Sequence, residues 1–331
     1  MTDELDVALN ELYPAPDEDT DTDTLRRVRV RVLRHVEKKP WRPRLSLAAA
    51  AVVLAAAVIA VAVLRGEPRG AMVEVANTLD TAADAQIRTV DEPVPAGAYR
   101  YIATHARSLA QANRDVAVLM GSRMETWVPA DPTGEWFMLR TDTGERTRLS
   151  GTEQKIKEAG LDVRSDPERL SGRCGGFYQA DMCTADGTWQ SPTAKFIAGL
   201  PRDPDELYDQ LRDDTDGRGV DPDLEVLVYA ADALRSGLLP ADLRAALYRA
   251  LSRLPDLKIT EQRATLDGRT GTALGVTAQG EQQEIIIDPV TGVFIGERHR
   301  VTEAMGNLPA GTVTGWTTVV YDIVAKPWQR P

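Results

Sequence analysis

Residues 45–64 read LSLAAAAVVLAAAVIAVAVL, and Ser46 is the only polar side chain among these twenty residues. A helix of this length, at about 1.5 Å per residue, covers roughly the 30 Å hydrocarbon core of a bilayer. Its backbone amides are satisfied within the segment, so the lipid meets no unpaired polar group. The stretch therefore predicts a single transmembrane helix.

Basic residues are distributed unevenly around this apolar stretch. Nine Lys or Arg residues lie between positions 26 and 44, whereas only Arg65 and Arg69 follow closely after it. Because cytoplasmic flanks are enriched in Lys and Arg, we expect a single-pass protein of the cell membrane with a cytoplasmic N-terminus and an extracytoplasmic C-terminal domain. The side chains expected at the membrane interface are Arg34, Lys38, Lys39, Trp41, Arg42 and Arg44.

Residues 45–64 have two other interpretations. Ala60-Val61-Ala62 has the A-x-A pattern of a signal-peptide cleavage site, but the 44 preceding residues far exceed a normal n-region. A buried helix of a soluble domain is the other interpretation, and it is disfavoured because the twenty residues have no polar face.

The segment before the apolar stretch has two parts. Residues 1–24 are acidic and contain proline, which predicts a flexible cytoplasmic tail. Residues 25–44 place apolar side chains on one stripe of a basic sequence and predict a juxtamembrane amphipathic helix. Such a helix would lie against anionic lipid or dock on a cytoplasmic protein, and the two roles are compatible.

The remainder of the chain is acidic. The net charge is −11, and about −10 of it falls beyond residue 64, where 40 acidic residues outnumber 30 basic ones. This balance argues against a nucleic-acid partner and mainly favours solubility.

Hydrophobic periodicity predicts an α+β domain over residues 93–331. Residues 65–92 have helical spacing and predict a helix or linker that follows the anchor. Helices are expected over 203–254, between strands over 97–141 and 256–325. Strands joined by short turns form antiparallel sheets, so we expect an antiparallel β-sheet covered by a helical block. The four expected N-terminal strands are AYRYIATHARS, DVAVLM, SRMETWVPA and GEWFMLRT, and residues 153–200 are expected to be irregular.

The two cysteines, Cys174 and Cys183, lie in a Gly-rich loop over residues 171–190. In an oxidising compartment they are expected to form a local disulfide. A metal site is the alternative, but two cysteines without a nearby histidine do not complete a tetrahedral ligand set. Two free thiols would require a reducing compartment, which the predicted topology disfavours.

Three motifs carry a resemblance to a known family: LPRDPDELYDQLR, GLLPADLRAALYRALSRLPDL and EIIIDPVTGVFIGERHRV. With the short tail, the basic helix and the Ala/Val-rich span, they resemble an uncharacterised actinobacterial family of single-pass membrane proteins, often encoded beside sigma-factor genes of the extracytoplasmic-function type. At the level of fold, the order strands–helices–strands behind an anchor resembles the half-barrel of periplasmic lipoprotein carriers and RseB-type sensors. The resemblance implies no catalytic residue.

Motifs for catalysis are missing from the sequence. It has no HExxH, no G-x-S-x-G, no phosphate-binding loop and no dinucleotide fingerprint. His105 and His299 fall in expected strands, where a hydrogen-bonded or exposed histidine is usual. Carboxylate pairs occur by chance among 40 acidic residues, so they do not indicate sugar hydrolysis. We therefore expect no enzyme and no cofactor, and an envelope hydrolase is the least favoured function.

One stretch resembles a calcium-binding loop. In DTDGRGVDPDLE, Asp214, Asp216, Gly219 and Glu225 occupy loop positions 1, 3, 6 and 12. Position 5 is Arg218, a cation where an oxygen ligand is needed. The favoured interpretation is an acidic loop before a helix that begins at Asp221-Pro222.

Five aromatic residues of the expected sheet allow two functions. They are Tyr99, Tyr101, Trp127, Trp136 and Trp316. Core packing against the helices is the favoured role, and an apolar groove is the alternative. The first functional hypothesis is a regulatory envelope binding module that contacts a cytoplasmic partner, with a sigma factor as the candidate. The second is a carrier-like module that accommodates a lipid or lipopeptide.

Overall fold

The computed structural model describes residues 67–88, 91–113, 115–178 and 182–331. The predicted tail, basic helix, transmembrane span and six interface side chains lie outside the described residues. Within the described ranges, no helix is long and apolar enough to cross a membrane.

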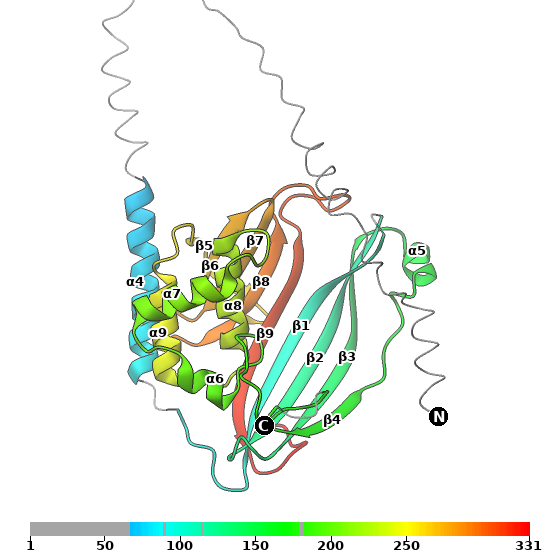
Figure 1. The fold of residues 1–331 in the computed structure, drawn as a ribbon. Coiled ribbons are helices and arrows are strands. Elements are labelled where there is room, and N and C mark those ends of the chain that lie inside the picture. Colours follow the sequence, from blue (N-terminus) through cyan, green and yellow to red (C-terminus); the bar gives the residue numbers. More distant parts are fainter. Residues whose placement is uncertain (1–66, 89–90, 114, 179–181) are drawn as a thin grey trace, which may run out of the picture. The chain divides into compact units, whose positions relative to one another are not determined.

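A single nine-stranded sheet organises the domain, in the order β4-β3-β2-β1-β9-β8-β7-β6-β5 (Figure 1). Every neighbouring pair is antiparallel. The first four strands and the last five meet where β1 pairs with β9, from Tyr99–Val324 to Ser108–Gly315. The strands are β1 (Tyr99–Asn113), β2 (Val116–Pro129), β3 (Glu135–Ser150), β4 (Glu168–Arg173), β5 (Lys258–Leu266), β6 (Arg269–Ala278), β7 (Glu281–Ile287), β8 (Phe294–Val301) and β9 (Val313–Val324).

The expected boundary between DVAVLM and SRMETWVPA is absent, because both belong to β2. Gly121, the residue between these two expected strands, lies inside β2. A Cβ atom there would come within 2.3 Å of the Thr143 hydroxyl on β3. The register between β2 and β3 shifts at this point, between Met120 and Ser122. This glycine therefore makes room for an irregularity in the neighbouring strand rather than ending its own.

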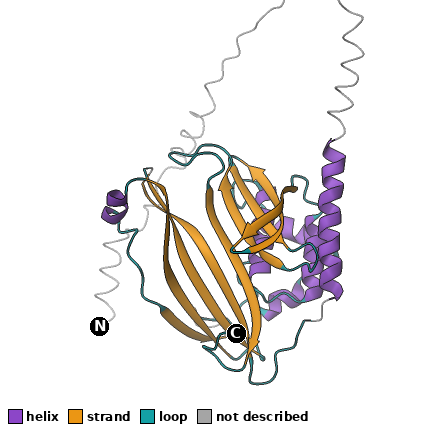
Figure 2. Ribbon diagram, turned by 180° about the vertical axis from the view of Figure 1, so that it is seen from behind, coloured by secondary structure: helices purple, strands orange, loops and turns teal. Residues whose placement is uncertain are grey.

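The helices cover one face of the β5–β8 part of the sheet (Figures 1 and 2). We call this the inner face and the opposite one the outer face. The largest buried cluster joins leucines of the helices, such as Leu227 and Leu247, to Leu274 and Ile285 of the sheet. The helices are α4 (Glu67–Arg88), α5 (Glu153–Glu158), α6 (Ala194–Gly199), α7 (Pro204–Thr215), α8 (Pro222–Arg235) and α9 (Ala241–Leu251). An antiparallel sheet with covering helices confirms the expected α+β class, while residues 153–200, expected to be irregular, contain α5, β4 and α6.

Local sequence explains the beginnings of α7 and α8. Asp203 and Asp221 each precede a proline at the first helical position, and each carboxylate accepts backbone N–H groups of the first turn. Proline loses nothing at this position because its missing N–H would have no helical partner. The aspartates satisfy amide groups that would otherwise lack acceptors.

Helix α4 is held against α9 and the turn before β8. Its Gln86 side chain donates to the Thr291 carbonyl at 3.0 Å and accepts from Arg244 Nε at 2.6 Å. Arg244 also binds Asp91 at 2.8 Å, and Asp91 caps the start of α9 through the amide of Ala241. The segment that would follow a transmembrane span is thus fastened to the domain core.

Candidate functional site

An apolar cleft of about 630 Å³ lies on the inner face, beside the helices. Strands β1–β3 form its floor, and α6, the end of α8 and the disulfide loop form its walls. Alternate residues of three neighbouring strands line the floor, because side chains at i and i+2 share one face of a sheet. The principal lining residues are Ile102, Met124, Trp136, Met138, Phe177 and Ile197.

The disulfide loop forms a wall of this cleft. Cys174 and Cys183 are bonded, with a Cα–Cα distance of 5.1 Å, which confirms the expected pairing. The Cys174 amide donates to the Gly134 carbonyl at 2.9 Å, and Gly175 lies directly on the ring of Trp136. Gly175 has φ of +79° and a Cβ atom there would come within 2.9 Å of that ring, so glycine is required.

Replacing both Cys174 and Cys183 with serine is expected to lower the free energy of unfolding by about 2 kcal/mol. The crosslink restricts a short loop in the unfolded chain, and closing a loop of this size accounts for a loss of that order. Urea titration of the full chain with and without dithiothreitol measures it. The wild type should fall to the level of the double variant on reduction, and the double variant should not respond. A reductant effect of equal size in both would contradict the prediction.

The cleft is polar where α8 ends. Both terminal nitrogens of Arg235 donate to carboxylates, one to Asp232 and the other to Glu297 of β8. The Asp232 and Glu297 side chains are 12 % and 3 % exposed, so these charges are largely withdrawn from water. Burial raises the pKa of Asp232 to about 6, with the Glu297 charge adding to the effect and Arg235 opposing it. The site therefore holds two carboxylates on one guanidinium.

Asp232→Asn is expected to stabilise the domain by about 2 kcal/mol at pH 8 and to have little effect at pH 4. The pKa of Asp232 rises from an ordinary value of 3.8 to about 6 on folding, so the folded state binds the proton more tightly. The stability that this proton contributes is lost as pH rises from about 4 through about 6. One pKa unit corresponds to about 1.4 kcal/mol, and the expected effect is set below the full conversion because Asp232 is partly exposed. Urea titrations of the full chain across this range measure it. A variant less stable than wild type at pH 8 would contradict the raised pKa of Asp232 in the folded state.

A second hollow of about 650 Å³ adjoins the cleft and shares Thr104, Met124 and Arg235 with it. Its lining is more charged and includes Asp166 and Asp142. Asp142 binds Arg146 at 2.5 Å, and this hydrogen bond holds the pKa of Asp142 well below its usual value. The inner face thus passes from an apolar end to a charged end.

The five aromatic residues considered from the sequence do not converge on the cleft. Trp136 lines it, whereas the other four lie on the outer face. Tyr101 and Trp127 are buried there under the C-terminal segment, with the Trp127 indole donating to the Gln329 carbonyl at 2.6 Å. For these four residues the packing role applies, although their partners are not the helices. Their sheet face depends on register, which hydrophobicity alone does not specify.

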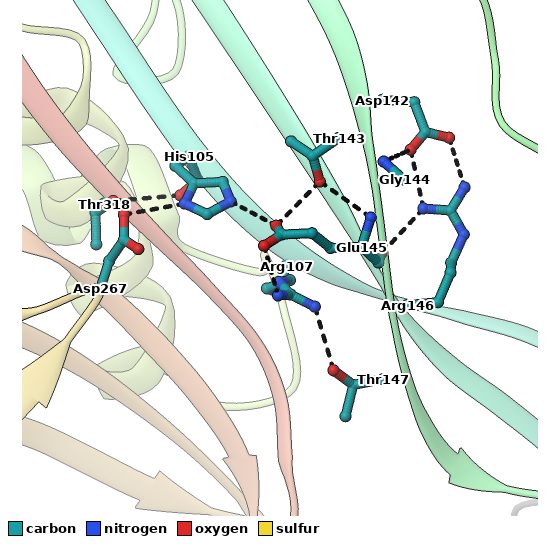
Figure 3. A network of polar contacts seen from close by, with 10 residues as sticks. All are labelled: His105, Arg107, Asp142, Thr143, Gly144, Glu145, Arg146, Thr147, Asp267 and Thr318. Carbon is teal, nitrogen blue, oxygen red and sulfur yellow. Dashed lines mark hydrogen bonds and ion pairs between the residues drawn. The ribbon is translucent and has the colours of Figure 1, made fainter.

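His105 lies on the outer face between two carboxylates (Figure 3). Its Nδ1 atom is 2.9 Å from Asp267 of the β5–β6 turn, and its Nε2 atom is 3.0 Å from Glu145 of β3. Hydrogen bonds from His105 and Thr143, with the charge of Arg107, hold the pKa of Glu145 below its ordinary value. The hydrogen-bonded role expected for a strand histidine is found. The network links strands distant in sequence.

The calcium-like loop has other partners. Asp214 accepts the indole N–H of Trp189 at 2.7 Å, and Asp221 caps α8. Across the described ranges, no group of three or more His, Cys, Asp or Glu side chains is arranged to hold a metal ion.

Several cleft residues were missed at the sequence level. Met124, Met138 and Asp232 were not singled out, and the only local signal is the i, i+2 spacing of Ile102 with Thr104, Met124 with Thr126 and Trp136 with Met138. That spacing indicates that the two residues of each pair share one face of the sheet, but it does not indicate whether this face is covered by other elements. Comparison of the sequence with protein-family models gives no match, and comparison with curated proteins gives none either.

Proposed function

We propose that this protein is a non-enzymatic binding module of the cell envelope that accommodates the apolar chain of a lipid or lipopeptide. One observation carries the proposal: a cleft of about 630 Å³ lies between the sheet and α6, lined mainly by apolar side chains. Ligand sites are typically concave and apolar with a few placed polar groups, and Asp232 and Arg235 supply such groups here. The predicted span at 45–64 would hold the domain beside its lipid source.

Met124→Lys is expected to reduce labelling of the cleft by a dodecyl probe roughly tenfold, because an ammonium group would replace a methionine against the alkyl chain. The full chain in phospholipid nanodiscs is irradiated with a benzophenone-tipped dodecanol, and modified peptides are located by mass spectrometry. Met305→Lys is the matched control, since Met124 and Met305 are similarly exposed, at 38 % and 43 %, and Met305 lies outside the cleft. Saturable adducts on Met124, Met138 or Phe177 support the proposal. Wild-type protein without adducts there would contradict it.

The regulatory role remains a second proposal, favoured by the basic helix predicted at 25–44 and by the family resemblance. In it, residues 1–44 contact a cytoplasmic protein, a sigma factor being the first candidate. Affinity purification of the full chain from membranes, compared with a chain whose basic residues at 26–44 are changed to glutamine, tests this. Recovery of the same proteins with both chains would argue against it.

A further inference from the structure

The polar end of the cleft has more negative than positive charge. Asp232 lines the cavity, and Arg235 lies between it and Glu297. His299 lies 3.8 Å from Glu297, and burial lowers the pKa of this histidine, which favours its neutral form above pH 7. Two carboxylates, one guanidinium and one neutral imidazole leave a net charge of −1, and both carboxylates are largely buried.

The other cations among the described lining residues do not compensate this charge. Lys195 binds Asp186 at 2.5 Å, and Arg202 binds Asp242 at 2.9 Å. Both terminal nitrogens of Arg235 are already engaged with carboxylates. An anionic ligand approaching Arg235 would therefore meet two carboxylates of its own sign.

A buried amide completes the surroundings of Glu297. Gln283 is 1 % exposed, and its Nε2 atom donates to Glu297 Oε2 at 3.0 Å. The amide is neutral, so this hydrogen bond supports Glu297 without adding a positive charge to the cluster.

We infer that the cleft selects amphiphiles with a cationic, hydrogen-bond-donating head, such as a primary ammonium, which would bind the Asp232–Arg235–Glu297 cluster while the chain occupies the apolar end. An ammonium supplies the missing positive charge together with three hydrogen-bond donors that a carboxylate such as Asp232 can accept. This inference rests on the proposed binding function and names the class of its ligand.

Three benzophenone-tipped probes with the same dodecyl chain test it: an amine, a carboxylate and an alcohol. The full chain in nanodiscs is titrated with each at a pH above 7, and cleft adducts are quantified by mass spectrometry. We expect the amine to reach half-maximal labelling at a concentration at least about tenfold below that of the carboxylate. In Asp232→Asn that ratio should fall to about one. Asp84→Asn, which removes a carboxylate of α4 paired with Arg249 outside the cleft, should retain the wild-type ratio.

The outcomes separate the two proposals. Cleft labelling without an amine preference, or with a carboxylate preference, would overturn the inference and leave the binding function standing. Cleft labelling by none of the probes would overturn both. An amine preference that persists in Asp232→Asn would also overturn the inference, because the selectivity would then arise elsewhere.

Discussion

Gly292→Ala is expected to lower the free energy of unfolding by about 4 kcal/mol. Gly292 has φ of +69°, a left-handed conformation that costs an L-residue roughly 1–2 kcal/mol. A Cβ atom there would lie 2.3 Å from the Ala82 carbonyl oxygen, so α4 would have to move. Such overpacking typically costs another 1–3 kcal/mol.

The displacement would affect more than one contact. Leu79 and Ala82 of α4 are fully buried in the main core. The Gly292 carbonyl also accepts the buried Tyr248 hydroxyl of α9 at 2.9 Å. The turn before β8 therefore contacts both α4 and α9, so its displacement should weaken the packing of both helices.

Gly97→Ala is the matched control for this prediction. Gly97 also has positive φ, at +81°, but a Cβ atom there would meet nothing within 4 Å. Its substitution should cost only about 1 kcal/mol, from backbone conformation alone. Urea titration of both variants in the full chain measures the difference. Equal losses would show that the close approach of α4 contributes nothing.

Arg330→Ala is expected to cost about 3 kcal/mol, because it removes the closer of the two cations that pair with a buried carboxylate. Arg330 binds both oxygens of Glu125 at 2.6 Å, and the Glu125 side chain is 0 % exposed. The Tyr101 hydroxyl, which donates to Glu125 at 2.5 Å, would remain, as would Arg123, whose Nε atom lies 3.7 Å from Glu125. An exposed ion pair is worth far less, so Lys157→Ala, which removes a partner of Glu153 on α5, should cost well under 1 kcal/mol.

The pH dependence of the stability loss in Arg330→Ala shows whether the buried charge of Glu125 causes that loss. Burial alone would raise the pKa of Glu125, but hydrogen bonds from Arg330 and Tyr101 hold it below the ordinary value. A lowered pKa contributes stability that is present above about pH 4.5 and lost as pH falls through the folded-state value. The difference between wild type and Arg330→Ala should therefore shrink in acid.

A double-mutant cycle with Glu125→Gln completes this test. The neutral amide removes the buried charge, so Arg330→Ala should cost less than about 1 kcal/mol in that background. The same cost in both backgrounds would mean that Arg330 stabilises the domain independently of Glu125. Urea titrations of the four chains decide between these outcomes.

Local sequence predicts much of the secondary structure for a physical reason. Period-two alternation and the Asp267-Gly268 turn, where both residues have positive φ, define the β5–β6 hairpin within a few residues. The Asp-Pro pairs at 203–204 and 221–222 likewise mark the starts of α7 and α8. These signals depend on backbone conformation and capping, which neighbouring residues control. The strand boundary expected around Gly121 is wrong because a glycine inside a strand has the same local signature as one in a turn.

The cysteine spacing and the expected oxidising compartment were enough to predict the disulfide between Cys174 and Cys183. Sequence alone also predicts the apolar span at 45–64, since crossing a bilayer depends on length and polarity and on no tertiary partner.

Only the tertiary structure decided which residues form the site. Arg235 and Glu297 lie 62 positions apart, and no local pattern relates them. Trp136 reaches the cleft while Trp127 lies on the outer face, because strand register determines the side of each residue. The raised pKa of Asp232 arises from burial and from Glu297 on a distant strand. Local sequence specifies helices, strands and turns through short-range sterics and hydrogen bonds, whereas a site depends on which surfaces the whole chain brings together and leaves open.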